Sequence, residues 1–582
     1  MRTPAFLGVE ASALGRRWVG PGAEDDRLAE AMAQQTGLPG ALCRILVRRG
    51  VSAPEAAGFL APALRDLLPD PLVLRDMGAA AARFVAAVQR GERIAIFADY
   101  DVDGGASAAL LLCWLRQMGR QATLYIPDRI DEGYGPNVPA MQMLAEAHDL
   151  IICVDCGTLS HEPIAAAKGA DVVVLDHHLG GETLPEALAV VNPNRQDEDG
   201  SLAHLCAAGV VFLMLVEANR QLRGVGTRGP DLLAMLDLVA LATVADVAPL
   251  VGVNRALVRQ GLKVMAGRQR PGLVALADVA RMDAAPNAYH LGFLLGPRVN
   301  AGGRIGQADL GARLLATEDP HEAEAMARRL DELNTERREI ENRVREEAMA
   351  QAEARGVDGP LVWAAGEGWH PGVVGIVAAR LKEATNRPAV VIGLDNGIGK
   401  GSGRSVTGVD LGAAIQRVAA EGLLLKGGGH KMAAGLTVTR ESLEPAMARL
   451  ADLLARQGAG SMGPQDLRLD ALLMPGAATP ELVEQIEAAG PFGAGAPAPR
   501  FAFPDVALTG LRRMGQNHLR FCFTDGMGAS IDAVCFGAFD CALGPMIEGH
   551  GGRRFHVAGR LEINTWGGRN RVQLRLEDAA LA

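Results

Sequence analysis

Acidic and imidazole side chains follow three short apolar runs of this chain, each at the point where the run ends. The three junctions are 93–98 followed by Asp99-Tyr100-Asp101-Val102-Asp103, 150–154 followed by Asp155, and 171–175 followed by Asp176-His177-His178. Carboxylate oxygens suit Mg²⁺, and a mixture of carboxylate and imidazole shifts the preference toward Mn²⁺. A turn would explain any one junction, but the three together indicate a divalent-metal site.

The ligand set is too large for one zinc ion. Zinc sites normally use four ligands and are rich in His and Cys. Five or more ligands with one shared carboxylate instead fit two cations about 3.5–4 Å apart, the arrangement used for in-line attack on phosphorus. The candidate ligands are Asp101, Asp103, Asp155, His177 and Asp246, with Asp99 and His178 near them. No Ser-His-Asp or Cys-His nucleophile pattern competes with this interpretation.

Two stretches of the sequence, one around Asp246 and one around Cys153, admit more than one interpretation. Asp246 stands alone in the stretch L-A-T-V-A-D-V-A-P-L, where it either caps a helix or is a buried carboxylate that a metal compensates. Cys153 and Cys156 form a C-x-x-C that would suit zinc or a redox pair. No second C-x-x-C follows at zinc-ribbon spacing, so a buried strand thiol is the favoured interpretation of Cys153.

The elements that must position these residues alternate in type. We expect strands at 93–98, 122–126, 150–154, 171–175 and 189–191, with helices at 106–118, 139–147 and 161–168 between the early ones. Strands that alternate with helices and are apolar on both faces are typical of a doubly wound parallel sheet in an α/β fold. Ligands bind such a sheet beyond the carboxyl ends of its strands, where the acids and histidines lie.

Composition and pattern divide the whole chain into five expected parts. The expected parts are a helical N-terminal region at 1–75, the catalytic domain at 76–318, a connecting helix at 319–357, a second α/β domain at 358–460 and a β-barrel at 465–582. The connecting helix is rich in Glu and Arg, so we expect it to be exposed; its apolar seam is thin for a coiled-coil partner. Alternating polar and apolar residues at 518–523 and 571–576 favour a small antiparallel barrel of the OB type.

Composition excludes some classes of protein. The 582 residues carry a net charge of −10, eight cysteines, no apolar signal region at the N-terminus and no uninterrupted apolar stretch near 18 residues. A secreted or membrane protein is therefore not expected, and the thinly spread cysteines fit the reducing cytoplasm. The net charge does not argue against a nucleic-acid partner, because a local basic groove can bind phosphates on an acidic protein.

Glycine-rich turns occur in the second α/β domain. The stretches G-K-G-S-G-R-S at 399–405 and G-G-G-H at 427–430 combine backbone N–H groups with Lys, Arg and Ser side chains, which suits phosphate. Neither stretch has Walker spacing, so no nucleotide-binding P-loop is predicted.

The ordered motifs D-Y-D-V-D-G, V-D-C-G, L-D-H-H and T-V-A-D-V-A-P-L closely resemble the DHH phosphoesterase superfamily. Further stretches, among them L-G-P-R-V-N-A-G-G-R-I-G, W-H-P-G-V-V-G-I-V-A-A-R and G-S-G-R-S, resemble the RecJ family of single-stranded-DNA-specific 5′→3′ exonucleases. The resemblance runs from about residue 50 to the C-terminus and implies DHH, DHHA1 and OB domains. One position departs from it: the second motif usually reads D-N-G, and here Cys156 replaces the Asn.

The resemblance implies a role for each residue. Asp101 and Asp103 would bind two different metals, Mn²⁺ or Mg²⁺, with Asp155 bridging them and His177 and Asp246 completing the coordination. His178 would face the scissile phosphate, Asp176 would orient an imidazole and Asp99 would support the ligands. The residues expected to bind the 5′-terminal phosphate and the strand are Arg129, Arg304, Ser402, Arg404 and His430.

The resemblance also implies partners. We expect single-stranded DNA as substrate, a monomeric enzyme away from membranes, and contact with single-stranded-DNA-binding protein and a RecQ-type helicase. The barrel would grip the strand; Phe521, Phe523 and Trp566 are its candidates for base stacking, with core packing favoured for the two Phe residues. Two alternatives remain open: an oligoribonuclease or cyclic-dinucleotide phosphodiesterase of the same superfamily, and a non-catalytic DNA-binding scaffold.

Overall fold

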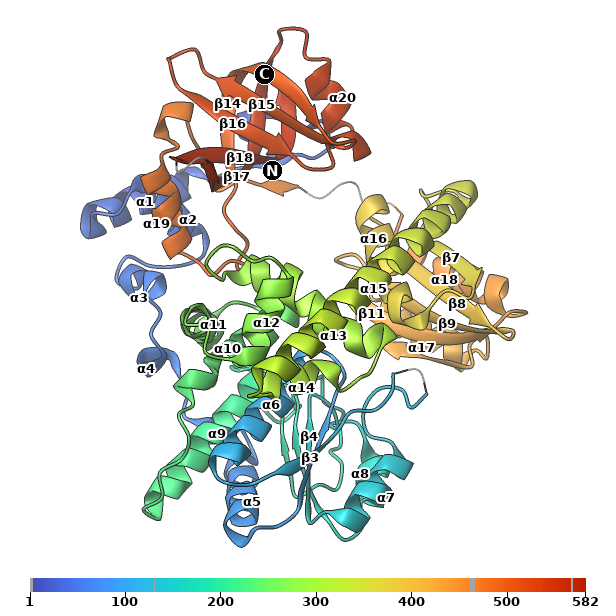
Figure 1. Ribbon diagram of the computed structural model, residues 1–582. Helices are drawn as coiled ribbons and strands as arrows, with labels where there is room; N and C mark the ends of the chain where they lie inside the picture. Colours follow the sequence, from blue (N-terminus) through green and yellow to red (C-terminus); the bar gives the residue numbers. More distant parts are fainter. Residues whose placement is uncertain (1–3, 130, 461–465, 567–568) are drawn as a thin grey trace. The chain divides into compact units, whose positions relative to one another are not determined.

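The computed structural model describes residues 4–129, 131–460, 466–566 and 569–582. It divides the chain into two compact units (Figure 1). One unit contains 68–249 and 257–462; the other contains 1–67, 250–256 and 463–582. In the described part of the chain, no helix is long and apolar enough to cross a membrane.

The first unit contains the predicted parallel sheet. Its strand order is β3-β2-β4-β5-β6, and all neighbours are parallel. The strands are β2 (Ile94–Ala98), β3 (Ala122–Tyr125), β4 (Leu150–Val154), β5 (Asp171–Leu175) and β6 (Ala189–Val191). The α/β fold with a doubly wound sheet is therefore confirmed. The strands β2, β4 and β5, whose ends carry the acids and histidines, are adjacent.

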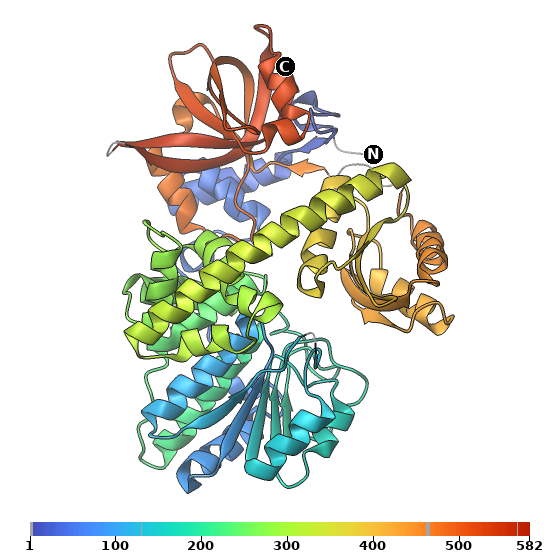
Figure 2. The ribbon, with the colours of Figure 1, turned by 45° about the vertical axis from the view of Figure 1, so that its right-hand side comes forward.

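Helices cover both faces of this sheet (Figure 2). On one face α7 (Val138–Ala147) and α8 (His161–Ala166) pack on apolar strand residues that include Phe97, Ile151 and Val174. On the other face lie α5 (Met77–Arg90), α6 (Val102–Gln117) and α9 (Ala207–Gly224). The strands are buried on both sides, which explains their continuous apolar runs.

After α9 the chain remains helical up to residue 355. The helices are α10 (Leu236–Ala245), α11 (Gly252–Ala266), α12 (Pro271–Val279), the π-helical segment η4 (His290–Leu295), α13 (Gly296–Ile305), α14 (Leu310–Ala316) and α15 (Pro320–Arg355). The long helix α15 begins after Asp319, whose carboxylate accepts the N–H groups of His321 and Glu322, and ends before Gly356.

The expectation that α15 is exposed is wrong for one of its faces. Its buried residues are Ala323, Met326, Ala327, Leu330, Leu333, Asn334, Arg337, Val344, Ala348 and Ala352. Many of these are alanines, and two are polar, so the buried stripe is weak in apolar composition although its helical spacing is regular.

A second, mixed sheet completes this unit. Its order is β10-β11-β9-β8-β7, formed by β7 (Val362–Glu367), β8 (Ala389–Asp395), β9 (Ile398–Arg404), β10 (Lys426–Gly429) and β11 (Ala433–Thr439). One face packs on α15 and α16 (Pro371–Thr385), and the other on α17 (Leu411–Ala420) and α18 (Leu443–Arg456).

The other unit contains a closed barrel with strand order β13-β14-β15-β16-β18-β17, in which β14 also pairs with β17. The strands are β13 (Ala471–Leu472), β14 (Phe501–Met514), β15 (His518–Thr524), β16 (Ser530–Cys535), β17 (Arg554–Trp566) and β18 (Arg569–Leu581). Phe521 and Phe523 are fully buried in its core, so the favoured core role of both is confirmed. The side chain of Trp566 lies outside the described residues.

N-terminal helices belong to the barrel unit. Helices α1 (Ala23–Thr36), α2 (Gly40–Arg48) and α3 (Ala56–Leu60) share a small core, which also includes Ala489 after α19 (Pro480–Ala488). The short strands β1 (Trp18–Val19) and β12 (Leu467–Arg468) pair in parallel, and the buried Trp18 donates its indole N–H to Asp578.

Candidate metal centre

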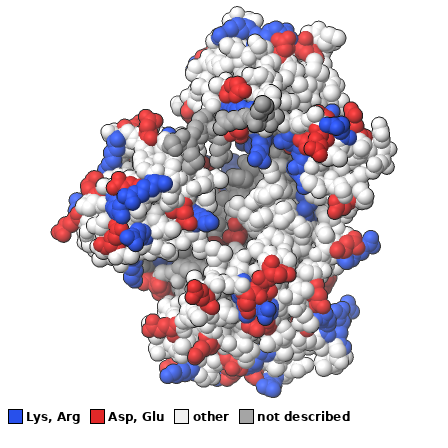
Figure 3. Space-filling model, turned by 180° about the vertical axis from the view of Figure 1, so that it is seen from behind, with Lys and Arg blue, Asp and Glu red and all other residues white. Residues whose placement is uncertain are grey.

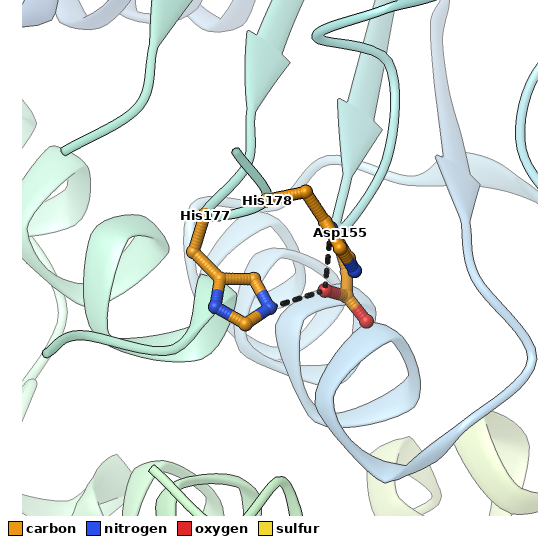
Figure 4. Close-up of side chains that lie close together, drawn as sticks. All are labelled: Asp155, His177 and His178. Carbon is orange, nitrogen blue, oxygen red and sulfur yellow. Dashed lines mark ion pairs between the residues drawn. The ribbon is translucent and has the colours of Figure 1, made fainter. Parts of the chain in front are cut away.

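Three acidic loops meet at the carboxyl edge of the parallel sheet, as the sequence predicts. Asp155 directly follows β4, is 2% exposed and has a left-handed φ of +61°. Its Oδ1 lies 3.2 Å from Nε2 of His177, and no hydrogen-bond donor reaches that oxygen among the described residues. In Figure 4 the His177 imidazole points toward this carboxylate. A buried carboxylate oxygen without a donor is costly unless a cation binds it.

His177 lies at the centre of the acidic cluster. Its Nε2 is 3.7 Å from Asp103, 3.2 Å from Asp155 and 3.8 Å from Asp246. Asp246 is the C-cap of α10 and is partly buried. The structure thus brings the lone Asp of the helical stretch to the same point as the strand-end acids. Asp246 occupies the C-cap position of α10, and its role as a metal ligand stays a prediction.

Helix N-termini hold two of the acids. Asp101 is the N-cap of α6, and its Oδ1 accepts the N–H groups of Asp103 and Gly104. The carboxylate of Asp103 is 1% exposed and accepts the N–H groups of Ala207 and Ala208, which start α9. Free N–H groups and the helix dipole favour a negative charge at these positions.

Burial and mutual repulsion raise the pKa of the clustered acids. Burial is the largest cause for Asp99, Asp103, Asp155 and Asp246, and neighbouring aspartates add to it. The pKa of Asp246 rises to about 8. A divalent cation bound among these acids would reverse the sign of the local electrostatic field and would therefore favour their ionised forms.

Asp176 has a different role from the other acids. Its Oδ1 accepts the backbone N–H groups of His177 and His178 and lies 2.8 Å from Nδ1 of His178, while its Oδ2 accepts both donors of Thr158. Burial raises the pKa of Asp176, but the hydrogen bonds to His178 and Thr158 and the charges of both histidines outweigh burial. The pKa therefore falls below its usual value, and Asp176 stays ionised. Burial lowers the pKa of His178, but Asp176 outweighs that effect and raises it to about 9.

Several supporting residues were missed by the sequence reasoning. The Tyr134 hydroxyl donates to the Asp155 carbonyl and lies 3.1 Å from Nδ1 of His178. The Asn192 amide donates to Thr158 and to the His178 carbonyl, and the Asn194 amide donates to the His177 carbonyl. Asn192 directly follows β6 and Asn194 is the third residue after it, so the strand-end rule that identified the acids would also have identified them.

The donor set fits divalent cations. Three groups have ligand atoms within 4.8 Å of one another: Asp155-His177-His178, Asp103-His177-Asp246 and Asp99-Asp101-Asp155. Residues shared between groups suit two neighbouring cations, and the mixture of carboxylate and imidazole suits Mn²⁺ or Mg²⁺ better than zinc. Asp99, whose buried Oδ1 also has no hydrogen-bond partner among the described residues, joins the set as a further candidate ligand.

No candidate metal group among the described residues includes a cysteine. Cys153 and Cys156 are fully buried in the apolar cluster between the sheet, α7 and α8, and the Cys156 thiol donates to the Val154 carbonyl. Burial raises the pKa of both thiols, so neither is prone to form the thiolate that zinc binds.

We therefore expect the Cys156→Asn variant to cleave single-stranded DNA at a rate within about tenfold of wild type. A tenfold change is about the lower end of the effects seen for residues that support metal ligands. The relative activity with Mn²⁺ and Mg²⁺ is the property we expect to change, because residue 156 adjoins Asp155. Metal analysis of the purified protein and initial rates with each cation check this. One zinc ion per chain, lost on either Cys153→Ser or Cys156→Asn, would instead support a zinc site.

Arginine side chains form a second cluster in the same unit. The Arg129 guanidinium lies 5.0 Å above the Tyr100 ring, Arg304 donates to the Gly372 carbonyl, and Arg404 donates to Ser402 Oγ and the Gly403 carbonyl. Burial and, less strongly, the charge of Arg129 lower the pKa of Arg304 to about 10, and the same two causes lower the pKa of Arg404. In the described part of the chain none of the three forms an ion pair, so an anion would relieve their repulsion.

Glycines let these arginines approach the start of α16. A Cβ on Gly375 would lie 3.0 Å from Ser402 Oγ and 3.2 Å from Arg404, and a Cβ on Gly372 would lie 2.4 Å from the Arg304 carbonyl. His370, the N-cap of α16, accepts the Gly372 N–H, and both burial and Arg129 lower its pKa. In the sequence His370 stands within the W-H-P-G motif, which alone gives it no role.

His430 follows β10, in the turn that leads into β11 beside Arg404. It is exposed in the turn between β10 and β11, where its backbone bonds to Ala433, and β11 pairs with β9 through Ala433 and Arg404. On the face seen in Figure 3, basic and acidic side chains are interspersed. Arg129, Arg304 and Arg404 are partly buried, and none of them pairs with a carboxylate among the described residues.

Comparisons with known proteins agree with this arrangement. Family models match at 93–243 (DHH family, N-terminal domain), 358–456 (DHHA1 domain) and 469–578 (RecJ OB domain). The chain is 39% identical over 565 residues to the single-stranded-DNA-specific exonuclease RecJ of Dickeya dadantii, covering 93% of this chain and 96% of that protein. It is 36% identical to RecJ of Escherichia coli, covering 95% and 98%.

Solved structures give the same result. The crystal structure of RecJ in complex with Mn²⁺ from Thermus thermophilus matches with a TM-score of 0.80 and 31% identity, over 97% of this chain and 79% of that one. The Mg²⁺ complex of the same protein matches with a TM-score of 0.74. With these matches spanning the sheet, the acidic cluster and the barrel, the chain belongs to the RecJ family.

Proposed function

We propose that this chain is a metal-dependent exonuclease that degrades single-stranded DNA from the 5′ end to 5′-mononucleotides and acts in DNA repair and recombination. The observation that carries the proposal is the cluster of buried carboxylates around Nε2 of His177, in a chain whose relatives are named single-stranded-DNA-specific exonucleases. The direction of digestion and the product are part of the proposal.

The metal ligands would be Asp101, Asp103, Asp155, His177 and Asp246. When bound, the two cations would activate water and neutralise charge on the phosphoryl oxygens. His178 is held by Asp176 through Nδ1, and its Nε2, which lies 3.3 Å from the Tyr134 hydroxyl, would donate a hydrogen bond to the scissile phosphate. The partly buried arginines and Ser402 would hold the terminal phosphate, which fixes where along the strand the metal centre cuts.

Digestion of a 5′-labelled single strand beside its duplex, with Mn²⁺, with Mg²⁺ and with EDTA, tests the proposal. We expect labelled mononucleotide from the single strand with either metal and none with EDTA. Release of long labelled fragments would indicate the opposite direction of digestion. Preferred cleavage of dinucleotides or cyclic dinucleotides would favour the phosphodiesterase alternative, and tight DNA binding without cleavage would favour the scaffold.

Arg404→Ala should weaken binding of a 5′-phosphorylated strand much more than binding of a 5′-hydroxyl strand. A charge-assisted Arg–phosphate contact contributes only where that phosphate exists. We expect a loss of about 2 kcal/mol for the phosphorylated strand and almost none for the other. Affinities of both strands, measured by fluorescence anisotropy in Ca²⁺ to prevent cleavage, give the comparison.

His178→Ala is the matched control, because it should slow single-turnover cleavage of both strands alike. Equal losses of affinity for the two strand ends in the Arg404 variant would mean that G-S-G-R-S follows the backbone generally and that the 5′ polarity arises elsewhere.

We propose the cellular setting on the same basis. Residues 76–318 would form the catalytic domain, 319–357 the connecting helix, 358–460 the DHHA1 domain, and 465–582 the barrel that holds the strand. A monomer in the cytoplasm, supplied with single strands by a RecQ-type helicase and single-stranded-DNA-binding protein, would suit this activity.

A further inference from the structure

Three exposed apolar side chains lie on two elements that pack against each other beside Asp246. Val247 is 69% exposed, Tyr289 53% and Phe293 69%. Val247 follows Asp246 at the end of α10, and the other two flank or lie on η4. We call the rings of Tyr289 and Phe293 the aromatic patch; Val247 lies on the adjoining element. Neither the metal centre nor the arginine cluster uses it.

Small residues hold η4 directly against the last turn of α10. A Cβ on Gly292 would lie 3.4 Å from Val244 Cγ1, and a Cβ on Gly296 would lie 3.1 Å from the Ala245 Cβ. Leu291 and Leu295 of the same segment are fully buried. The inner side of η4 is therefore fixed, and the exposed rings belong to a rigid segment that is tied to the helix carrying Asp246.

The geometry of the patch is that of a stacking platform. The rings of Tyr289 and Phe293 are stacked, with centroids 5.1 Å apart and planes at 23°. Flat exposed aromatic faces are the surfaces on which proteins stack the bases of single strands, without regard to sequence. π-Helical turns such as η4 occur frequently at functional sites.

Val247 supplies an independent sign of function. It is a β-branched residue with φ +60°, a conformation that L residues rarely adopt. Backbone strain of this kind persists only where the surroundings enforce it, and it concentrates at active sites. Here it presents an apolar side chain to solvent one residue after Asp246, which lies 3.8 Å from Nε2 of His177.

We propose that the aromatic patch stacks on a base of the DNA strand next to the scissile phosphate. Because Asp246 lies 3.8 Å from Nε2 of His177, a strand with its phosphate at the metal centre would have neighbouring bases within reach of the surface around Asp246. The patch itself has no charged group and would contact bases rather than phosphates, a function complementary to that of the arginine cluster. The inference rests on the proposed nuclease function and adds a subsite to it.

The test uses Phe293→Ala and Tyr289→Ala, with Phe293→Tyr as the conservative variant. Leu233→Ala is the matched control: Leu233 is 54% exposed and precedes α10, about 15 Å of helix away from Asp246. Single-turnover cleavage is measured with Mn²⁺ as a function of enzyme concentration, on an intact single strand and on four strands that each lack one base at positions one to four from the 5′ end.

For the intact strand we expect the enzyme concentration at half-maximal rate to rise about tenfold in Phe293→Ala and in Tyr289→Ala, which is the effect of losing one base stack. The same concentration should be unchanged in Phe293→Tyr and in Leu233→Ala. For one abasic strand, wild type and the alanine variants should bind equally weakly, which identifies the stacked nucleotide. Equal affinity of Phe293→Ala and Leu233→Ala for the intact strand would overturn the inference, as would a tenfold loss that persists on every abasic strand. A wild-type protein that does not cleave the intact strand would instead contradict the proposed function.

Discussion

Asp155→Ala should abolish DNA cleavage, with a decrease in turnover of about 10³-fold or more, because the proposed function makes Asp155 a ligand of both cations and such a ligand contributes several kcal/mol of transition-state stabilisation. Asp155 is the acid that two of the three candidate metal groups share, and it lies closest to Nε2 of His177. Its buried Oδ1 has no other partner among the described residues. The measurement is single-turnover cleavage of a labelled single strand in saturating Mn²⁺.

The fold should survive this substitution, since Asp155 makes no side-chain hydrogen bond that holds the strands together. Circular dichroism and affinity for uncleaved DNA in Ca²⁺ check that point. Asp149→Ala is a useful control: this partly exposed acid pairs with Arg93 at the opposite ends of β2 and β4, and its loss should leave turnover unchanged. Near-normal cleavage by folded Asp155→Ala would remove Asp155 from the reaction.

The sequence predicted those parts of the site that follow a simple rule of parallel sheets. Asp101, Asp155 and His177 follow buried strands, and adjacent parallel strands bring their carboxyl ends together. Asp246 lies on a helix distant in the sequence, and only its apolar surroundings indicated that its carboxylate was unusual. The strand positions themselves followed from continuous apolar runs, which both faces of a covered sheet require.

Other parts of the site and of the fold depend on contacts that no local sequence pattern encodes. Tyr134 reaches the Asp155 carbonyl from a loop 21 residues earlier in the chain. The buried stripe of α15 was missed because its alanines and Arg337 differ little in composition from an exposed face. Phe293 is apolar and would ordinarily be assigned to a core; only the structure shows that its ring faces solvent.

Removing divalent metal should lower thermal stability, and more strongly at pH 8 than at pH 5.5. In the metal-free protein, burial and neighbouring acids raise the pKa of Asp99 and Asp155, and that of Asp246 to about 8. The unfolded chain releases these protons near pH 3.9. The folded state therefore binds more protons than the unfolded state between about pH 4 and pH 8, so the free energy of unfolding falls as the pH rises through that window. His178, whose pKa rises to about 9, adds to the same slope above pH 6.5.

Mn²⁺ should cancel this decrease in the free energy of unfolding, because the cation replaces the protons bound by the clustered acids. At 100 times its Kd, Mn²⁺ should stabilise the fold by about 2.7 kcal/mol. Thermal unfolding of wild type and Asp155→Asn, with EDTA or Mn²⁺ at pH 5.5 and pH 8, provides the test. Without metal, Asp155→Asn should unfold at a higher temperature than wild type at pH 8, since it removes a repelling carboxylate, and the difference should shrink at pH 5.5. With Mn²⁺ the order should reverse, because wild type retains the full ligand set.

A metal-free Asp155→Asn variant no more stable than wild type at pH 8 would show that these acids do not repel one another in the folded protein. Stabilisation by Mn²⁺ that is the same in both proteins would place the metal elsewhere.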